Sequence, residues 1–210
     1  MSYLILWFIL LVFSILLSVF MHEIAHGLSA YLNDIPVSTG FNKVGDIYKK
    51  PEDEDFRKEH KNHKNYADFG VIVNLILAIL FTYLLYIIEH KYFLWIIGAL
   101  AFTNSLLRLI PMVHVYLKLI LKGELVIEDE IETGLNLYKK TKIKVLKYLP
   151  SLVSLFVSYI CFSYTRFGLF TKLPVLFSYK WIFILVSLFA FLSSYKLLDR
   201  LDNKIRINWW

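Results

Sequence analysis

Residues 22–27 read His-Glu-Ile-Ala-His-Gly, and three of their side chains are suited to metal chemistry. In a helix, residues i and i+4 share a face, so His22 and His26 point the same way. Two imidazoles in this arrangement can occupy two positions of a tetrahedral zinc ion at about 2.0–2.1 Å. Glu23 lies about 100° around the helix, close to the metal without being forced to bind it. The spacing therefore predicts one zinc ion per chain, with Glu23 as the general base for a water molecule at the metal.

This motif follows an uncharged stretch, Tyr3 to Met21, that is long enough to be most of a membrane span. An ionisable side chain at the centre of a bilayer costs about 2.5–3.5 kcal/mol. The alternative interpretation is a chance HExxH on a solvated helix face, whose polar groups reach the membrane interface. A chance motif in this place would still have to hide three polar groups. The context therefore favours the metal site.

The composition indicates a membrane protein. Hydrophobic residues make up 58% of the 210 residues, aromatic residues 17%, and the mean hydropathy is +0.56. A membrane span needs about 20 apolar residues, and five such runs cover roughly 3–28, 68–88, 92–121, 148–166 and 175–197. Because open sheets leave backbone groups unsatisfied in lipid, we expect an all-α membrane protein, a polytopic bundle of about five spans. The first run has no preceding basic residues and no cleavage site, so it does not resemble a signal peptide.

The basic residues are distributed unevenly between the connections. Seven lie in 34–66, six in 122–147 and four in the tail after 195, whereas the alternate connections hold four. The positive-inside rule then predicts a multi-pass protein of the cell membrane, with the N-terminus outside and the C-terminus in the cytoplasm. Acidic residues such as Glu52 and Asp53 interleave with the bases. No clean basic patch forms, and we expect no nucleic-acid partner.

The polar connection 34–66 is too short for an independent domain, since domains usually start near 50 residues. Pro36, Gly40 and Gly45 disfavour a helix there. The apolar and β-branched residues between positions 37 and 47 predict a short hairpin near the membrane surface.

Two further patterns accompany the HExxH motif. Gly70 and Asn74 form Gly-x-x-x-Asn at the start of the second apolar run, and Arg108 and Pro111 form Arg-x-x-Pro late in the third. In this order, the three patterns resemble the site-2 protease family of intramembrane zinc metalloproteases, and the chain resembles a small, divergent member. The resemblance covers roughly residues 8–135.

The resemblance implies a three-span metalloprotease core within residues 1–135, with a two-span region in 136–210 that carries no assignable motif. It also implies hydrolysis of peptide bonds in membrane-anchored protein substrates. It would place Asn74 near the substrate strand, where an amide can bind an extended backbone or stabilise an oxyanion. A hydrogen bond between helices is an equal alternative for Asn74.

The third pattern departs from that of the family. Arg108 stands where the family has Asn, and no Asp follows Pro111 within a few residues. Arg108 is expected to pair with an acidic residue or to extend toward the interface, and a catalytic role in stabilising an anion is the alternative. The departure also leaves the third zinc ligand open.

We favour Asp129 as this third ligand, because the family uses an aspartate there and no other Asp lies between positions 69 and 198. The predicted topology supports an acid from 124–130, since the third span would end on the same side of the membrane as His22. The alternative is that this acidic cluster is the solvated start of a helix and has no function. The other candidate ligands are Glu128 and Glu130, followed by Glu124 and His114.

Two other classes of function remain open. The missing aspartate after Pro111 is compatible with a catalytically altered family member that acts as a membrane scaffold, although His22, Glu23 and His26 are all retained. A metal transporter is the second alternative. Transporters place ionisable residues near the midplane of the membrane, whereas here they concentrate near one end of the spans.

Overall fold

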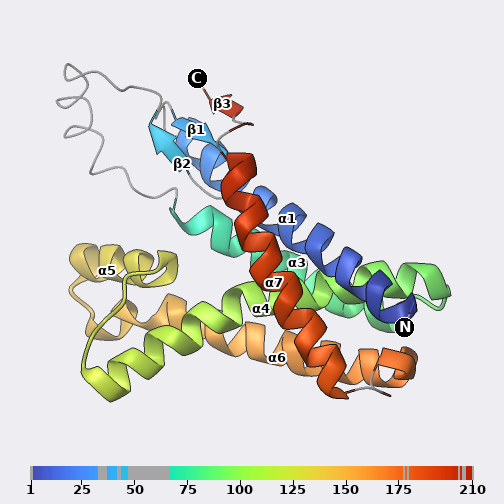
Figure 1. The fold of residues 1–210 in the computed structure, drawn as a ribbon. Helices are drawn as coiled ribbons and strands as arrows, with labels where there is room; N and C mark the ends of the chain where they lie inside the picture. Colours follow the sequence, from blue (N-terminus) through green and yellow to red (C-terminus); the bar gives the residue numbers. More distant parts are fainter. Residues whose placement is uncertain are drawn as a thin grey trace.

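The computed structural model of the chain describes residues 2–32, 37–41, 44–46, 67–176, 178, 180–202, 204 and 207–209. These residues form a helical bundle with a small β-sheet at one end (Figure 1). The five longest helices are α1 (Ser2–Tyr31), α3 (Ala67–Ile87), α4 (Lys91–Lys122), α6 (Leu149–Lys172) and α7 (Lys180–Asp202). All five are long and apolar enough to cross a membrane. The predicted fold class, an all-α polytopic bundle, is confirmed.

The last two long helices end further along the chain than predicted. Helix α6 continues past Arg166 to Lys172, and α7 begins at Lys180 rather than near 175. The Lys172 ammonium donates hydrogen bonds to the carbonyls of Tyr86 and Ile88, at 2.7 and 3.1 Å, where α3 ends. The charge of Lys172 interrupts the apolar run of the sequence, but α6 still continues to this residue. Its ammonium group binds the last carbonyls of α3, as basic side chains near helix ends commonly do. A 3₁₀ turn, η3 (Pro174–Leu176), then separates α6 from α7.

One stripe of α1 faces the bundle, and its chemistry changes along the helix. At the amino-terminal half, Trp7 and Leu11 are fully buried, and the Trp7 ring packs against Phe102 and Phe183. Further along, the same stripe carries buried serines and then the two histidines. The Asn104 amide of α4 donates a hydrogen bond of 3.0 Å to Ser18 Oγ. The bundle-facing stripe of α1 therefore has an apolar half and a polar half, and the HExxH motif lies in the polar one.

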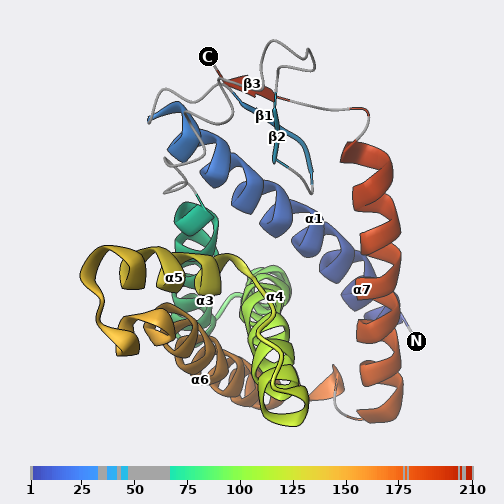
Figure 2. The ribbon, with the colours of Figure 1, turned by 90° about the vertical axis from the view of Figure 1, so that its left-hand side faces the viewer.

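The other long helices surround α1 from two sides. Helix α4 packs against α1, α3 and α6, whereas α7 packs on α1. The turned view shows α7 beside α1, with α3, α4 and α6 grouped on the opposite side (Figure 2). The carboxyl-terminal half of α1 is thereby held against the start of α3.

A sixth helix, α5 (Asp129–Thr141), was not predicted as a separate element. The chain doubles back after α4 to form it (Figure 1), and Gly123 ends α4 at a positive φ of 68°. The first turn of α5 is acidic and its last turn is basic, which complements the helix dipole. Ile131, fully buried, packs with Met112 and Val115 of α4. This contact docks α5 onto the bundle.

The sheet contains the predicted hairpin and one strand that was not anticipated. Strands β1 (Val37–Thr39) and β2 (Val44–Asp46) pair antiparallel, so the hairpin is confirmed. Strand β3 (Ile207–Trp209) pairs antiparallel with the other edge of β1, which gives the order β2-β1-β3. The Trp209 indole donates a hydrogen bond of 2.8 Å to Thr39 Oγ1. A Cβ atom on Gly27 would overlap both of these side chains, so this glycine lets the sheet lie against α1.

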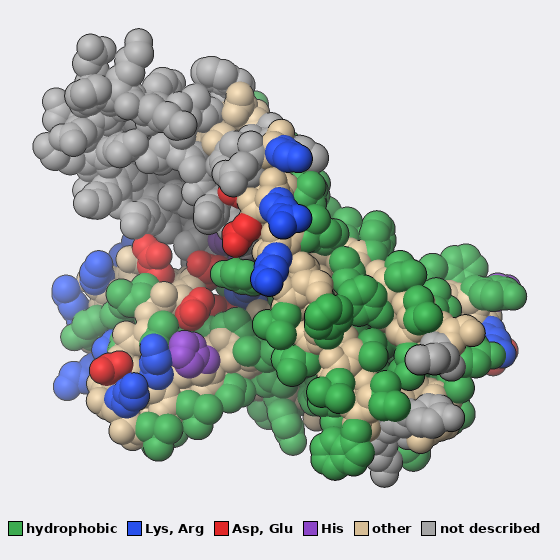
Figure 3. Space-filling model, in the orientation of Figure 1, with side chains coloured by type: hydrophobic (Ala, Val, Ile, Leu, Met, Phe, Trp, Pro, Cys, Tyr) green, Lys and Arg blue, Asp and Glu red, His purple; other side chains and the backbone are tan. Residues whose placement is uncertain are grey.

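Charged side chains gather at one end of the molecule. Figure 3 shows hydrophobic side chains over much of the bundle, with charged ones around α5 and along the upper part of α7. The carboxyl ends of α1, α4 and α7 and the start of α3 lie toward this end (Figure 1). The side of the membrane that this end faces stays a prediction.

Candidate metal centre

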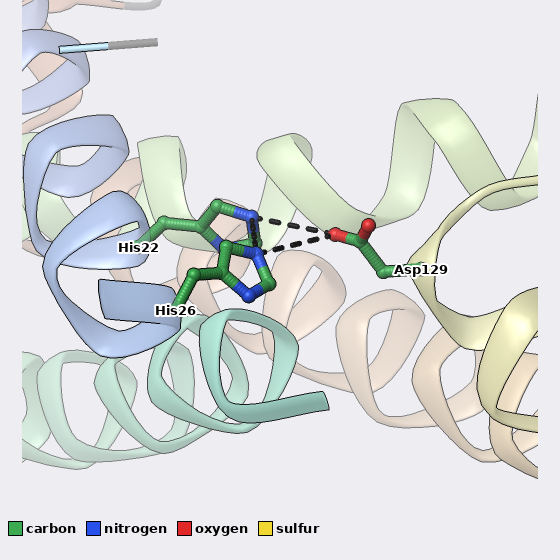
Figure 4. Close-up of side chains that lie close together, drawn as sticks. All are labelled: His22, His26 and Asp129. Carbon is green, nitrogen blue, oxygen red and sulfur yellow. Dashed lines mark hydrogen bonds and ion pairs between the residues drawn. The ribbon is translucent and has the colours of Figure 1, made fainter. Parts of the chain in front are cut away.

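Three predicted site residues converge between α1 and α5. His22 and His26 extend from adjacent turns of α1 toward Asp129, the first residue of α5 (Figure 4). The two Nε2 atoms lie 2.9 Å apart. Asp129 Oδ2 lies 3.4 Å from His22 Nε2 and 3.7 Å from His26 Nε2. Within the described part of the chain, these three side chains form the one group of His, Cys, Asp or Glu with the spacing of a metal site.

The dimensions of this group fit a zinc ion. Tetrahedral zinc with bonds of about 2.0–2.1 Å has ligand atoms about 3.3–3.4 Å apart. The three edges here are 2.9, 3.4 and 3.7 Å, so they bracket that value and leave a point about 2 Å from every ligand atom. The donor set, two imidazoles and one carboxylate, is also one that zinc uses in catalytic sites. The group could therefore hold a metal ion.

Gly70 lets helix α3 approach the histidine pair. A Cβ atom at this position would lie 2.6 Å from His22 Cε1 and would also overlap His26 Nε2. Any side chain larger than hydrogen would thus push α3 away or fill the space beside the imidazoles. Helices that must approach this closely commonly use small residues at the contact.

The carboxylate of Asp129 is held in its ionised form. Burial favours the neutral acid, but the imidazoles of His22 and His26 outweigh this effect, and the pKa of Asp129 lies below its ordinary value. Arg108 of α4 adds a cation, with Nη1 3.7 Å from Asp129 Oδ2. An ionised carboxylate is the form that a metal ion requires.

The other candidate ligands do not join the group formed by His22, His26 and Asp129. Glu130 points to Arg108 and Ser154, with distances of 3.6 Å from its Oε1 to Arg108 Nη1 and 2.7 Å to Ser154 Oγ. Glu128 precedes α5 as its N-cap residue, and burial, together with the neighbouring carboxylates, raises its pKa. Glu124 and His114 are exposed and lie outside the converging group. The expected pairing of Arg108 with acidic residues is present.

Glu23 and Asn74 are both buried, Glu23 on α1 beside the group and Asn74 on α3. Glu23 is 8% exposed and interacts electrostatically with His26 and Asp129. Asn74 follows Gly70 by one helical turn, so both residues lie on the same face of α3. Asn74 is 1% exposed, and its Oδ1 accepts no hydrogen bond from the described residues. A buried acceptor without a donor is costly unless a ligand or water supplies one.

Two features of the centre were not found from the sequence. One is that two acids share Arg108: the sequence predicted a pairing with an acidic residue but did not identify Asp129 and Glu130 as the partners. The other is the sheet against Gly27, whose third strand has too few residues to show a periodicity. Neither contact partner could be named without the fold.

Comparisons with protein-family models, with curated proteins and with solved structures give no match for this chain. The fold and the site thus rest on the chain's own geometry. They define a helical bundle of the membrane-spanning type with a candidate metal centre at one end of its spans.

Proposed function

We propose that this chain is an intramembrane zinc metalloprotease that hydrolyses peptide bonds of membrane-anchored proteins, as its resemblance to the site-2 protease family implies. The observation that carries the proposal is the convergence of His22, His26 and Asp129 within 3.7 Å of one another. The burial of Glu23 beside them supports it. The centre lies in α1 and α5 of a bundle with five helices suited to a membrane.

His22, His26 and Asp129 would hold one zinc ion per chain. A bound zinc ion supplies Lewis-acid polarisation of a peptide carbonyl and makes a water molecule more acidic. Glu23 accepts the proton of the attacking water and passes it to the leaving amine. Asn74 offers its free oxygen to a backbone N–H of the substrate. The burial of His22, Glu23 and His26 limits the access of bulk water to these three side chains.

A transmembrane substrate would have to unwind locally before cleavage, because its amides are hydrogen-bonded within its own helix. The polar half of α1 places the centre toward the charged end of the bundle, where water is available. With the predicted orientation, this end is the cytoplasmic side of the cell membrane.

The test compares the wild-type protein with Glu23→Gln after purification in detergent. Bound zinc is measured per chain, and cleavage of a model transmembrane substrate is followed by mass spectrometry. Glu23→Gln keeps the side-chain shape but removes the proton acceptor, so activity should fall by about 10²- to 10⁴-fold while zinc is retained. Glu124→Gln, an exposed position, is the matched control and should retain activity.

Other results would favour the alternatives. Zinc binding without cleavage by the wild type would contradict the protease and favour a membrane scaffold. Uptake of zinc into vesicles that contain the wild-type protein would favour a transporter. A chain that binds no zinc would contradict the metal centre itself.

A further inference from the structure

Two adjacent carboxylates at the start of α5 lie in different surroundings. The Asp129 side chain is 35% exposed and faces the histidine pair, whereas the Glu130 side chain is 1% exposed and faces α4 and α6. A carboxylate with so little exposure is costly unless a cation or donors compensate it. Glu130 therefore requires compensating partners of its own.

Arg108 supplies the compensating charge to both acids. Its Nη1 atom lies 3.6 Å from Glu130 Oε1 and 3.7 Å from Asp129 Oδ2. The same Oδ2 atom of Asp129 faces both histidines. One guanidinium nitrogen is thus shared between a residue of the candidate metal centre and a residue outside it.

This sharing has a consequence for metal binding. A cation beside Oδ2 attracts the carboxylate and repels a metal ion, so an arginine paired with Asp129 alone would compete with the metal. A second carboxylate on the same nitrogen reduces this competition, because it neutralises the arginine from the other side. The Ser154 hydroxyl holds Glu130 in this position with a hydrogen bond of 2.7 Å. Helix α5 contributes two side chains to this arrangement, Asp129 and Glu130, and helices α4 and α6 contribute one each.

We propose that Glu130 is a positioning residue of the metal centre: fixed by Ser154, it takes up the charge of Arg108 and leaves Asp129 free to face the histidine pair. The inference rests on the proposed metal site at His22, His26 and Asp129. It assigns a role to Glu130 that differs from that of a ligand. It also predicts that metal affinity depends on residues that do not touch the metal.

The first test is the zinc affinity of Glu130→Gln, measured in detergent by competition with a chelator. Substitutions of residues that orient metal ligands typically weaken affinity by about 10- to 100-fold, and we expect a loss in this range. Glu124→Gln removes the same charge from an exposed position of the 123–128 connection and should bind zinc as the wild type does. Equal affinities of the two variants would overturn the proposal.

The decisive test is a rescue. In the double variant Glu130→Gln with Arg108→Met, the competing cation is absent, and we expect zinc affinity to recover by about 10-fold. Removing Arg108 also relieves a buried charge that has lost a partner, so the free energy of unfolding is measured on both variants. A role of Glu130 in holding the fold alone predicts that zinc affinity changes only in step with that free energy. A double variant that binds zinc no better than Glu130→Gln would therefore contradict the proposal.

Ser154→Ala provides a milder test should Glu130→Gln fail to fold. It should weaken zinc binding less than Glu130→Gln does, by about 3- to 10-fold, since it removes one hydrogen bond to the Glu130 carboxylate but leaves the charge of that carboxylate in place. Ser158→Ala is the matched control. Ser158 is buried one turn further along α6, and its hydroxyl donates to the Ser154 carbonyl of its own helix at 2.6 Å. Equal zinc affinity of these two serine variants would contradict the role of Ser154.

The failure of this inference can be told apart from that of the proposed function. A wild-type chain without zinc affinity would overturn the metal site. A wild-type chain that binds zinc, with all the variants unchanged, would overturn only the role of Glu130.

Discussion

His22 and His26 reach the candidate metal centre from a single helix, whereas Asp129 reaches it from another helix that follows two further long helices along the chain. The spacing of the two histidines is set by the helical repeat, which needs no tertiary contact. The position of Asp129 depends on how α5 docks against α4 and α6 through Ile131 and Glu130. One half of the centre is thus local in origin, and the other half is tertiary.

This difference in origin predicts that the two halves of the centre respond to different substitutions. The histidine half should respond mainly to changes of the ligands themselves and of the surface beside them. The aspartate half should also respond to packing changes that leave every ligand in place. Metal affinity and the free energy of unfolding, measured on the same variants, separate the two cases.

The largest effect is expected for His22→Ala. Loss of an imidazole ligand should exceed the effect of an orienting residue, so zinc affinity should fall by more than about 100-fold. Chelator competition in detergent measures it. His114→Ala, which changes an exposed histidine outside the centre, should have no effect, and an equal loss for the two variants would contradict the assignment of His22.

Asp129→Asn tests the tertiary half directly. The amide is neutral and a weak zinc ligand, so we expect zinc affinity to fall by about 100-fold, with circular dichroism unchanged. Glu128→Gln, at the preceding position, should change zinc affinity by less than about threefold, because its carboxylate does not join the converging group. A greater loss for Glu128→Gln would move the third ligand to that residue.

Ile131→Ala and Leu11→Ala separate packing from ligation. Both side chains are fully buried, and each truncation should lower the free energy of unfolding by about 2–5 kcal/mol. Ile131→Ala should also weaken zinc binding, because it loosens the helix that carries Asp129. Leu11→Ala lies in the apolar half of α1 and should leave zinc affinity unchanged. Equal zinc affinities of the two variants would remove the distinction between the two halves.

Gly70→Ala should have the smallest effect on stability, about 1–3 kcal/mol from overpacking. Its methyl group would press on the His22 ring, so zinc affinity should fall as well. Gly98→Ala is the matched control, since its Cβ atom would press on Leu169, away from the centre. Thermal unfolding and zinc titration of both variants should show similar destabilisation but a loss of zinc affinity for Gly70→Ala alone.

Much of this architecture follows from patterns in the sequence. The apolar runs predict the five long helices, because the length and composition of a membrane-spanning helix are constrained by the bilayer. The predicted ends of the last two differ from α6 and α7, since the contacts of Lys172 with α3 are tertiary and absent from a hydropathy pattern. The hairpin was predictable from its glycines and β-branched residues, but its third strand was not.

By itself, the sequence determined the existence of the five long helices and the geometry of the histidine pair, because both depend on residues close together in the chain. It narrowed the third ligand of the centre to a short acidic segment, in which the family resemblance favoured Asp129 and left Glu128 and Glu130 as alternatives. Only the tertiary structure decided that Asp129 faces the histidines while Glu130 faces Arg108 and Ser154. The physical reason is that adjacent residues of a helix point about 100° apart, so the docking of α5 sends each carboxylate to a different partner.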